Sequence, residues 1–226
     1  MSIWIKICGN TSLEDALLAA EVGADAVGFV FAPSPRRVTT EQVAGIVPRL
    51  PATVEKIGVF VDAALGEIVS TVEACGLTGV QLHFEAEPEL PARLRERLGA
   101  EARILCVIHF DEQTAVQCAA QLAEYESNPC VNAVLVDSRA SMTAGGTGTT
   151  FDWAAARKAL FHHAGTKKRL IAAGGLNPAN VAEAIATMRP WGVDAATGVE
   201  AAPGRKDAAK VREFVKRARA GDREPE

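Results

Sequence analysis

The chain has 226 residues, of which 48% are hydrophobic and 23% are charged, and its formal net charge at pH 7 is -4. This composition is typical of a globular protein that buries a full apolar core. Because the charge balance is slightly acidic, the chain has no global basic field to bind nucleic acid or an anionic membrane surface, and an anionic ligand would need a local site.

The N-terminal stretch is an apolar run over residues 3–7 that stops at Cys8, which a glycine and an asparagine follow. It predicts a buried strand that delivers a thiol to a loop. Strand alternation places Trp4, Lys6 and Cys8 on one face, so the thiol shares its face with a cation. The alternative is a packing role, because free cysteine is among the most buried residue types.

Strand-like and helix-like patterns alternate along the rest of the chain. The expected strands after the first cover residues 25–31, 54–61, 78–83, 103–109, 131–137, 168–173 and 192–197. The expected helices are one that Thr11 or Ser12 caps and that ends at Gly23, and others over 40–50, 64–75, 88–98, 112–126, 152–161, 178–188 and 207–219.

This order predicts an α/β fold that is a single (β/α)8 TIM barrel. Strands that are almost continuously apolar belong to a parallel sheet covered on both faces, and eight such units close into a barrel. An open doubly wound sheet is the alternative. No linker divides the chain, so we expect one catalytic barrel domain over residues 1–220 and a frayed tail over 221–226.

Polar or conformationally permissive residues follow the expected strands at their C-terminal ends. Active sites of (β/α)8 barrels lie at this face, so these residues are the candidates for a site. They are Cys8, Arg36, His83, Asp137, Gly174, Gly175, Thr197 and Gly198.

The exits of the seventh and eighth strands predict a phosphate site. Gly174 and Gly175 have no side chains to keep a ligand from the backbone. Thr197 and Gly198 open a segment that we expect to form a short extra helix, and backbone N–H groups at such helix starts bind phosphate. A simple turn is the alternative for the glycine pair taken alone.

A long loop over residues 138–150 follows the sixth strand and is rich in Gly, Ser and Thr, with Gly146 near its middle. Loops of this length inside a compact domain are usually functional or disordered. Because the loop follows Asp137 at a strand end, we expect it to be a mobile cover over the site.

Two arginines, Arg36 and Arg37, follow two prolines that stiffen the loop after the second strand. At least one of them is expected to hold an anionic group in a forked, bidentate geometry. The alternative is a solvated surface pair, and this alternative remains open above all for Arg37.

An ordered set of motifs resembles the phosphoribosylanthranilate isomerase family of tryptophan biosynthesis. The motifs span most of the chain and are specific as a set. They are K-I-C-G (6–9), G-F-V-F-x-x-S-P-R (28–36), V-Q-L-H (80–83), L-V-D-S (135–138), G-G-T-G-x-x-F-D-W (145–153), A-G-G-L-N-P-x-N-V (173–181) and T-G-V-E-x-x-P-G-x-K-D (197–207).

The resemblance implies an Amadori rearrangement of N-(5-phosphoribosyl)anthranilate that needs neither a metal nor an organic cofactor. It implies that Cys8 is the general base at C2 of the sugar and that Asp137 is the general acid at the ring oxygen. Arg36 would hold the anthranilate carboxylate. The other substrate-binding residues that it implies are His83, Gly146, Gly174, Gly175, Thr197 and Gly198.

The chemistry of the residues agrees with these roles. The reaction needs an acid and a base on opposite sides of a sugar, and the first and sixth strands are well separated around a barrel. A thiol must have a depressed pKa to act as a base near neutral pH, and Lys6 can supply the cation. Asp137 must start protonated, which partial desolvation at the rim promotes.

One position departs from the family pattern, because Phe84 stands where the family usually has glycine after Gln-Leu-His. We expect the Phe84 ring to line the pocket beside the anthranilate ring, where aromatic packing adds affinity. The alternative is a ring that packs outward on the neighbouring loop.

Three rival functions share parts of this pattern. By resemblance, a histidine-pathway aminoaldose isomerase would be expected to carry an aspartate where this chain has Cys8. An enzyme acting on indoleglycerol phosphate would present other charged groups at the barrel mouth. A phosphosugar-binding barrel without catalysis would have no need for both Cys8 and Asp137.

The five cysteines are odd in number and include no C-x-x-C pair, which argues against a disulfide framework and against a zinc site. Neither a leader pattern nor an apolar run long enough to span a membrane is present in the sequence. We therefore expect a cytoplasmic protein without metal, with a small phosphorylated substrate as its partner, that is a monomer or a homodimer.

Overall fold

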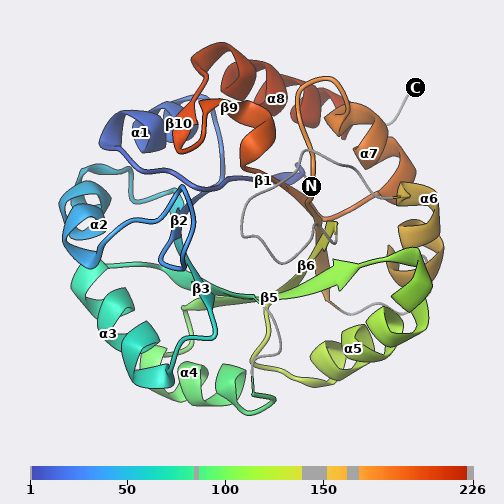
Figure 1. The fold of residues 1–226 in the computed structure, drawn as a ribbon, viewed down its shortest axis with the longest axis horizontal. Helices are drawn as coiled ribbons and strands as arrows, with labels where there is room; N and C mark the ends of the chain where they lie inside the picture. The colour runs from blue at the N-terminus through green and yellow to red at the C-terminus, as the bar shows by residue number, and fades with distance from the viewer. Residues whose placement is uncertain (1, 84–86, 139–151, 162–167, 223–226) are drawn as a thin grey trace.

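The computed structural model describes residues 2–83, 87–138, 152–161 and 168–222. Eight parallel strands form a closed barrel in the order of the sequence, and the first strand pairs with the last (Figure 1). The strands are β1 (Trp4–Ile7), β2 (Ala26–Val30), β3 (Glu55–Val61), β4 (Gly79–His83), β5 (Arg103–Phe110), β6 (Ala133–Ser138), β7 (Arg169–Ala172) and β8 (Gly192–Ala195).

Helices surround the barrel on its outside, as Figure 1 shows. They are α1 (Leu13–Glu21), α2 (Thr40–Ile46), α3 (Leu65–Cys75), α4 (Leu90–Leu98), α5 (Ala115–Ser127), α6 (Trp153–Ala156), α7 (Val181–Met188) and α8 (Ala208–Gly221). The predicted (β/α)8 barrel is therefore confirmed, and the pairing of β1 with β8 excludes the open sheet. Within the described residues, no helix is long and apolar enough to cross a membrane.

Some expected helices are shorter in the structure. The helix expected over 40–50 ends as α2 at Ile46 and continues as a 3-10 turn over Val47–Arg49. Pro48 explains the change, because proline has no N–H for the helical hydrogen bond and its ring clashes with the preceding turn. A 3-10 turn likewise precedes α5, and a π-helical turn over Arg157–Phe161 follows α6.

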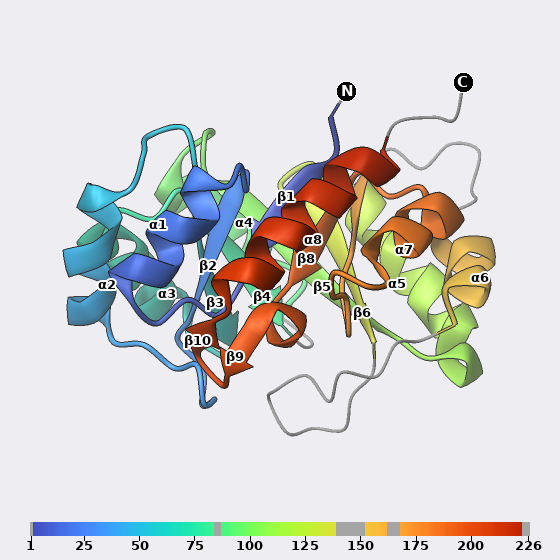
Figure 2. The ribbon, with the colours of Figure 1, turned by 90° about the horizontal axis from the view of Figure 1, so that it is seen from above.

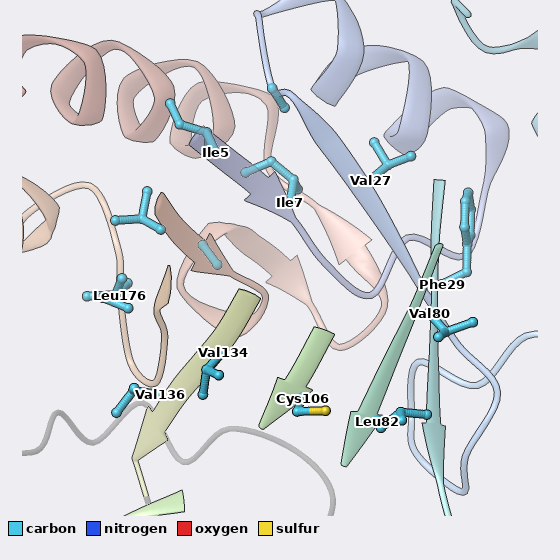
Figure 3. Packing of buried hydrophobic residues seen from close by; sticks show 14 of the residues in the cluster. Ile5, Ile7, Val27, Phe29, Val80, Leu82, Cys106, Val134, Val136 and Leu176 are labelled. Atoms are coloured by element: carbon cyan, nitrogen blue, oxygen red, sulfur yellow. The ribbon is translucent and has the colours of Figure 1, made fainter. Parts of the chain in front are cut away.

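Strand alternation divides the core into two apolar layers. The outer layer lies between the strands and the helices, and Figure 3 shows part of it, including Ile5, Ile7, Val27 and Phe29. The inner layer fills the barrel. It consists of Trp4, Ala26, Ile57, Leu105, Val107, Ala133, Leu135, Ile171 and Ala173.

Aromatic and charged side chains fill the N-terminal end of the barrel. Trp4 stacks on Trp191 with a distance of 5.2 Å between ring centroids. The guanidinium groups of Arg103 and Arg169 lie 5.9 Å and 4.7 Å from the centroid of Trp191. Arg103 also pairs with Glu55 through two hydrogen bonds. These contacts stabilise the end of the barrel opposite the predicted site.

The connection between β8 and α8 differs from the expected extra helix. A single 3-10 turn, η4 (Thr197–Val199), leads into two short antiparallel strands, β9 (Glu200–Ala202) and β10 (Arg205–Lys206). Gly204 makes the turn between them with φ of 77°. Figure 2 shows this β9–β10 hairpin at the end of the barrel away from the N-terminus. The helix prediction was thus right only for the first turn.

The C-terminal helix reaches further than expected. Gly221 is the last residue of α8, and the carboxylate of Asp222 accepts a hydrogen bond of 2.8 Å from the backbone N–H of Ile3. Two residues of the expected tail, Gly221 and Asp222, therefore belong to α8 and its C-cap. Residues 223–226 lie outside the described part of the chain.

Candidate active site

Cys8 follows β1 at the C-terminal end of the barrel and is only 6% exposed. Its backbone N–H donates to the carbonyl of Ala195, which fixes it against β8. Gly28 of the neighbouring β2 leaves room for the thiol, because a Cβ there would lie 2.6 Å from Cys8 Sγ and 3.1 Å from Lys6 Cε. The structure thus confirms that Lys6 and Cys8 share the inner face of β1.

Lys6 is fully buried in the barrel, where its Nζ donates to Oδ1 of Asp194 over 2.9 Å. Burial lowers the pKa of Lys6, but the charges of Asp194 and Cys8 outweigh burial and leave this pKa above its usual value. Lys6 is therefore a permanent cation whose charge a carboxylate already balances. In the sequence, the sign of this ion pair is a single charged residue in each of two otherwise apolar strands, β1 and β8, which lie side by side in the barrel.

The thiol of Cys8 is not activated in the way that the sequence led us to expect. Burial raises the pKa of Cys8 above its usual value, and Lys6 and Lys206 lower it only in part. Asp194 adds to the rise because its charge opposes a thiolate nearby. The expected depression of the pKa is therefore wrong, since loss of solvent outweighs a cation that is already paired.

Asp137 is half-buried near the end of β6, where it lies opposite His109 of β5 in the sheet register. Leu135, two residues earlier, belongs to the inner layer, so strand alternation directs Asp137 into the mouth of the barrel. The structure thus brings Cys8 and Asp137 to the same end of the barrel, on the non-adjacent strands β1 and β6.

Two histidines from adjacent strands occupy the same end. The rings of His83 and His109 have centroids 5.5 Å apart, and Gln81 Nε2 lies 2.8 Å from His83 Nε2. Burial lowers the pKa of His83 to about 3, and the nearby charges of His109 and Lys6 add to this effect. His83 is therefore a neutral hydrogen-bonding group near pH 7 and not an anion-binding cation.

Arg36 is buried near the C-terminal end of the barrel, but its guanidinium group already donates hydrogen bonds within the protein. Its Nε donates to Glu200 Oε1 over 2.8 Å, and its Nη2 donates to Glu200 Oε2 over 2.7 Å and to Thr197 Oγ1 over 3.1 Å. Glu200 thus occupies the bidentate geometry that we expected for a ligand. Arg37 is exposed, which confirms the solvated alternative for that residue.

The exits of β7 and β8 bring two glycine-containing segments together. Gly174 and Gly175 have φ of 82° and 65°, which L side chains rarely adopt. A Cβ on Gly198 would lie 2.0 Å from the carbonyl oxygen of Leu176, so the two segments touch backbone to backbone. Within the described part of the chain, the N–H groups of Gly175 and Gly198 donate to no other residue. Both remain available to an anion.

Substitution of Gly198 by alanine should weaken binding of a phosphorylated substrate. The added Cβ cannot fit 2.0 Å from the Leu176 carbonyl, so the η4 backbone must move away from β7. We expect KM to rise about tenfold, which corresponds to ~1.4 kcal/mol of binding. Steady-state kinetics measure this change. Gly66→Ala in α3 is the matched control, because a Cβ there meets no atom within 4 Å, and an unchanged KM for Gly198→Ala would contradict the phosphate site.

Sequence reasoning missed Lys206, a buried cation beside Cys8. Lys206 of the β9–β10 hairpin donates through Nζ to the Cys8 carbonyl over 2.6 Å, to the Ala196 carbonyl over 3.3 Å and to Glu200 Oε1 over 3.2 Å. Nothing in the local pattern marks Lys206 as buried, because it lies 198 positions from Cys8. Only the hairpin brings the two together.

Three expectations cannot be placed in this site. Gly146 and the rest of residues 139–151 lie outside the described residues, as does Phe84 with its expected ring contact. Among the residues that the structure describes, no group of three or more His, Cys, Asp or Glu side chains could hold a metal ion.

The fold and the polar groups at the strand ends define an enzyme of the TIM barrel class. A family model described as N-(5'-phosphoribosyl)anthranilate (PRA) isomerase matches residues 5–217. N-(5'-phosphoribosyl)anthranilate isomerases from Pelobacter propionicus and Geobacter sulfurreducens are each 44% identical, over 95% of this chain and 94% and 98% of theirs. The chain therefore belongs to the N-(5'-phosphoribosyl)anthranilate isomerase family, whose members are isomerases of tryptophan biosynthesis.

Solved structures agree with this assignment. Phosphoribosylanthranilate isomerase from Thermotoga maritima is 36% identical, with a TM-score of 0.84 over 96% of this chain and 99% of that one. Another isomerase, solved in complex with reduced 1-(o-carboxyphenylamino)-1-deoxyribulose 5-phosphate, is 34% identical, with a TM-score of 0.80 over the same shares. A further Thermotoga maritima structure, with a TM-score of 0.78 and 35% identity over 96% of this chain and 99% of that one, shows monomers generated from a dimeric isomerase.

Proposed function

We propose that this isomerase converts N-(5-phosphoribosyl)anthranilate to 1-(2-carboxyphenylamino)-1-deoxyribulose 5-phosphate with Cys8 as general base and Asp137 as general acid. The observation that carries the proposal is the convergence of a buried thiol from β1 and a half-buried carboxyl group from β6 at one end of the barrel. Acid and base on non-adjacent strands suit a reaction that needs proton transfer at two separate atoms.

The proposed steps balance without an external reactant. Asp137 gives a proton to the ring oxygen, the C1–O bond breaks, and the nitrogen lone pair forms a protonated C=N bond. The thiolate of Cys8 then takes the proton from C2, and the C2–H electron pair forms a C1=C2 double bond while the nitrogen becomes a neutral amine. The resulting enolamine gains a proton at C1 from solvent and loses one to solvent from the C2 hydroxyl, which gives the aminoketose. Solvent also takes the proton from Cys8 and returns one to Asp137, which restores both groups.

Cys8 is a sufficient base because the protonated C=N bond makes the proton on C2 more acidic. Removal of a proton beside it needs only a weak base, because the electron pair moves toward a positively charged nitrogen. A thiol whose pKa burial has raised is also a stronger base once it is ionised. The cost lies in ionising the thiol, and the nearby charge of Lys6 reduces that cost.

The remaining contacts are assigned to the two anionic ends of the substrate. Arg36 is proposed to bind the anthranilate carboxylate through Nη1, because its other donors already face Glu200 and Thr197. The amides at Gly174, Gly175, Thr197 and Gly198 are proposed to bind the phosphate. His83, and Gly146 from the segment outside the described residues, complete the proposed substrate contacts.

A single assay tests the proposed reaction. The purified protein is incubated with N-(5-phosphoribosyl)anthranilate, and the loss of anthranilate-type fluorescence is followed with time. We expect turnover without an added metal or cofactor, and the same rate after treatment with a chelator. A wild-type protein that leaves this substrate unchanged, but rearranges the aminoaldose of histidine biosynthesis, would overturn the proposal.

Replacement of Arg36 and Arg37 by alanine should separate a binding residue from a solvated one. Arg36→Ala removes the buried cation that we assign to the carboxylate and should raise KM about tenfold or more. Arg37 is exposed, so Arg37→Ala should change KM less than about twofold. Initial rates at varied substrate concentration measure both, and equal effects would contradict the assignment.

Compartment and assembly also belong to the proposal. All five cysteines are free thiols in the structure, which fits a reducing cytoplasm. A homodimer is one of the two assembly states that we infer, because a related isomerase from Thermotoga maritima is described as dimeric, and a monomer is the other.

A further inference from the structure

Glu200 lies at the centre of a buried cluster of three charges. Its Oε1 accepts hydrogen bonds from Arg36 Nε over 2.8 Å and from Lys206 Nζ over 3.2 Å, and its Oε2 accepts from Arg36 Nη2 over 2.7 Å. The side chains of Arg36, Glu200 and Lys206 are 7%, 3% and 0% exposed. Two cations and one anion leave a net charge of +1, which suits a ligand carboxylate.

The contacts of Glu200 fix the orientation of the Arg36 guanidinium. Two parallel hydrogen bonds through Nε and Nη2 hold a planar group in one plane and one rotation. Thr197 Oγ1 accepts a further hydrogen bond from Nη2. Within the described residues, Nη1 is the nitrogen of Arg36 that donates to no other residue. Glu200 therefore sets the direction of Nη1 before any substrate arrives.

The same cluster also contacts the strand that carries the thiol. Lys206 Nζ donates to the backbone carbonyl of Cys8 over 2.6 Å, while it donates to Glu200. A Cβ on Gly9 would lie 2.6 Å from Cδ of Arg36, so the Arg36 side chain lies directly against the backbone that follows Cys8. Both proposed functional side chains, Arg36 and Cys8, thus depend on the β9–β10 hairpin for their position.

A purely structural role is the competing explanation. Buried ion pairs often add little to stability compared with apolar residues of the same shape, so their presence needs another reason. The pair of Arg103 with Glu55 at the opposite end of the barrel has the same bidentate chemistry but no proposed ligand. Its side chains are 22% and 24% exposed, so it offers a control for what loss of a bidentate pair does to the fold in a less buried setting.

We propose that Glu200 is a positioning residue that aims Arg36 Nη1 at the substrate carboxylate and, through Lys206, holds the backbone of Cys8. The proposal rests on the proposed function, because it takes the carboxylate of the substrate as the ligand of Arg36. It makes the β9–β10 hairpin the part of the chain that couples recognition of the carboxylate to placement of the base.

Glu200→Gln tests this inference, because it removes the charge and keeps the shape. We compare inhibition by two reduced product analogues, 1-(2-carboxyphenylamino)-1-deoxyribitol 5-phosphate and the same compound without the carboxylate. Glu200→Gln should weaken the carboxylated inhibitor about tenfold or more and the other less than about twofold. KM for the substrate should rise about tenfold or more, with a smaller fall in kcat.

The variant Glu55→Gln is the control, and it should leave both inhibition constants unchanged. A double-mutant cycle with Arg36→Ala then shows whether Glu200 acts through Arg36. In the Arg36→Ala background, Glu200→Gln should add no further loss of the carboxylated inhibitor. If Glu200→Gln fails to fold, Glu200→Asp replaces it, because the charge remains while the shorter chain shifts the guanidinium.

Each outcome decides between the two proposals. Equal weakening of both inhibitors, or independent losses in the double mutant, would assign a structural role to Glu200 and overturn the inference. Unchanged inhibition in a protein where Arg36→Ala still raises KM would overturn it too, while the proposed function stands. A wild-type protein that does not turn over N-(5-phosphoribosyl)anthranilate would overturn the proposed function instead.

Discussion

Cys8→Ala should lower kcat by about 10²- to 10⁴-fold, the usual contribution of a general base. The variant should still fold, because the Cys8 side chain lies at the C-terminal end of the barrel. The adjacent Gly28 has no side chain that packs on the thiol. It should also still bind the reduced product analogue, since Arg36 and the glycine segments are untouched. Stopped-time assays with high enzyme concentration measure the residual rate.

Two further variants make the Cys8 result specific. Cys8→Ser keeps the size of the side chain but replaces the thiol by a hydroxyl, and it should be as inactive as Cys8→Ala. Cys106→Ala removes a buried thiol of β5 that belongs to the outer layer, and it should lower the melting temperature while kcat stays near wild type. A Cys8→Ala enzyme with wild-type kcat would show that Cys8 is a packing residue.

The raised pKa of Cys8 also predicts the pH profile. The base must be deprotonated, and burial places the pKa of this thiol above its usual value. The active fraction of free enzyme is therefore small at pH 7, and kcat/KM should rise through pH 8 and 9. A cysteine with a depressed pKa would give a plateau over that range. His83, whose pKa is about 3, should contribute no step near pH 6.5.

Asp137→Ala and Asp137→Asn should each lower kcat by about 10²- to 10⁴-fold, because neither can give a proton to the ring oxygen. Asn has nearly the shape of Asp, so Asp137→Asn tests the acid with the least change in packing. The product analogue should bind both variants with little loss, because no ring-opening proton transfer is needed for binding. Single-turnover rates and calorimetric binding measure the two effects separately.

Asp111 supplies the control for Asp137. It directly follows β5 at the same end of the barrel, where its carboxylate accepts a hydrogen bond from the backbone N–H of Gln113. Asparagine serves equally well at such a capping position, so Asp111→Asn should keep both stability and kcat. If Asp137→Asn were as active as Asp111→Asn, another group would be the acid.

The sequence predicts most of the fold because burial on both faces leaves an unambiguous apolar pattern in the strands. The strand expected over 54–61 is β3 (Glu55–Val61), and the one expected over 78–83 is β4 (Gly79–His83). Strand ends then locate the site, since the barrel brings every exit to one face. Cys8 and Asp137 are placed at this face because each lies at the C-terminal end of a strand that the sequence predicts.

The rest of the site depends on contacts that no local pattern encodes. Arg36 meets Glu200 across 164 positions, and Lys206 meets Cys8 across 198. Both contacts need the β9–β10 hairpin. Its strands have only three and two residues, so hydrophobic periodicity in the sequence does not detect them. The direction of the Cys8 pKa likewise depends on burial depth, which the sequence does not give, so the nearby Lys6 misled the prediction.

The ion pair inside the barrel has a consequence for how the chain is made. Lys6 is synthesised before its carboxylate partner Asp194, which lies 188 positions later. A nascent chain that ends before β8 would have to place an unpaired ammonium group among apolar side chains, which costs several kcal/mol. The unpaired Lys6 therefore disfavours an intermediate in which seven strands close without β8. We expect the interior of the barrel to become complete only when β8 has paired with β1.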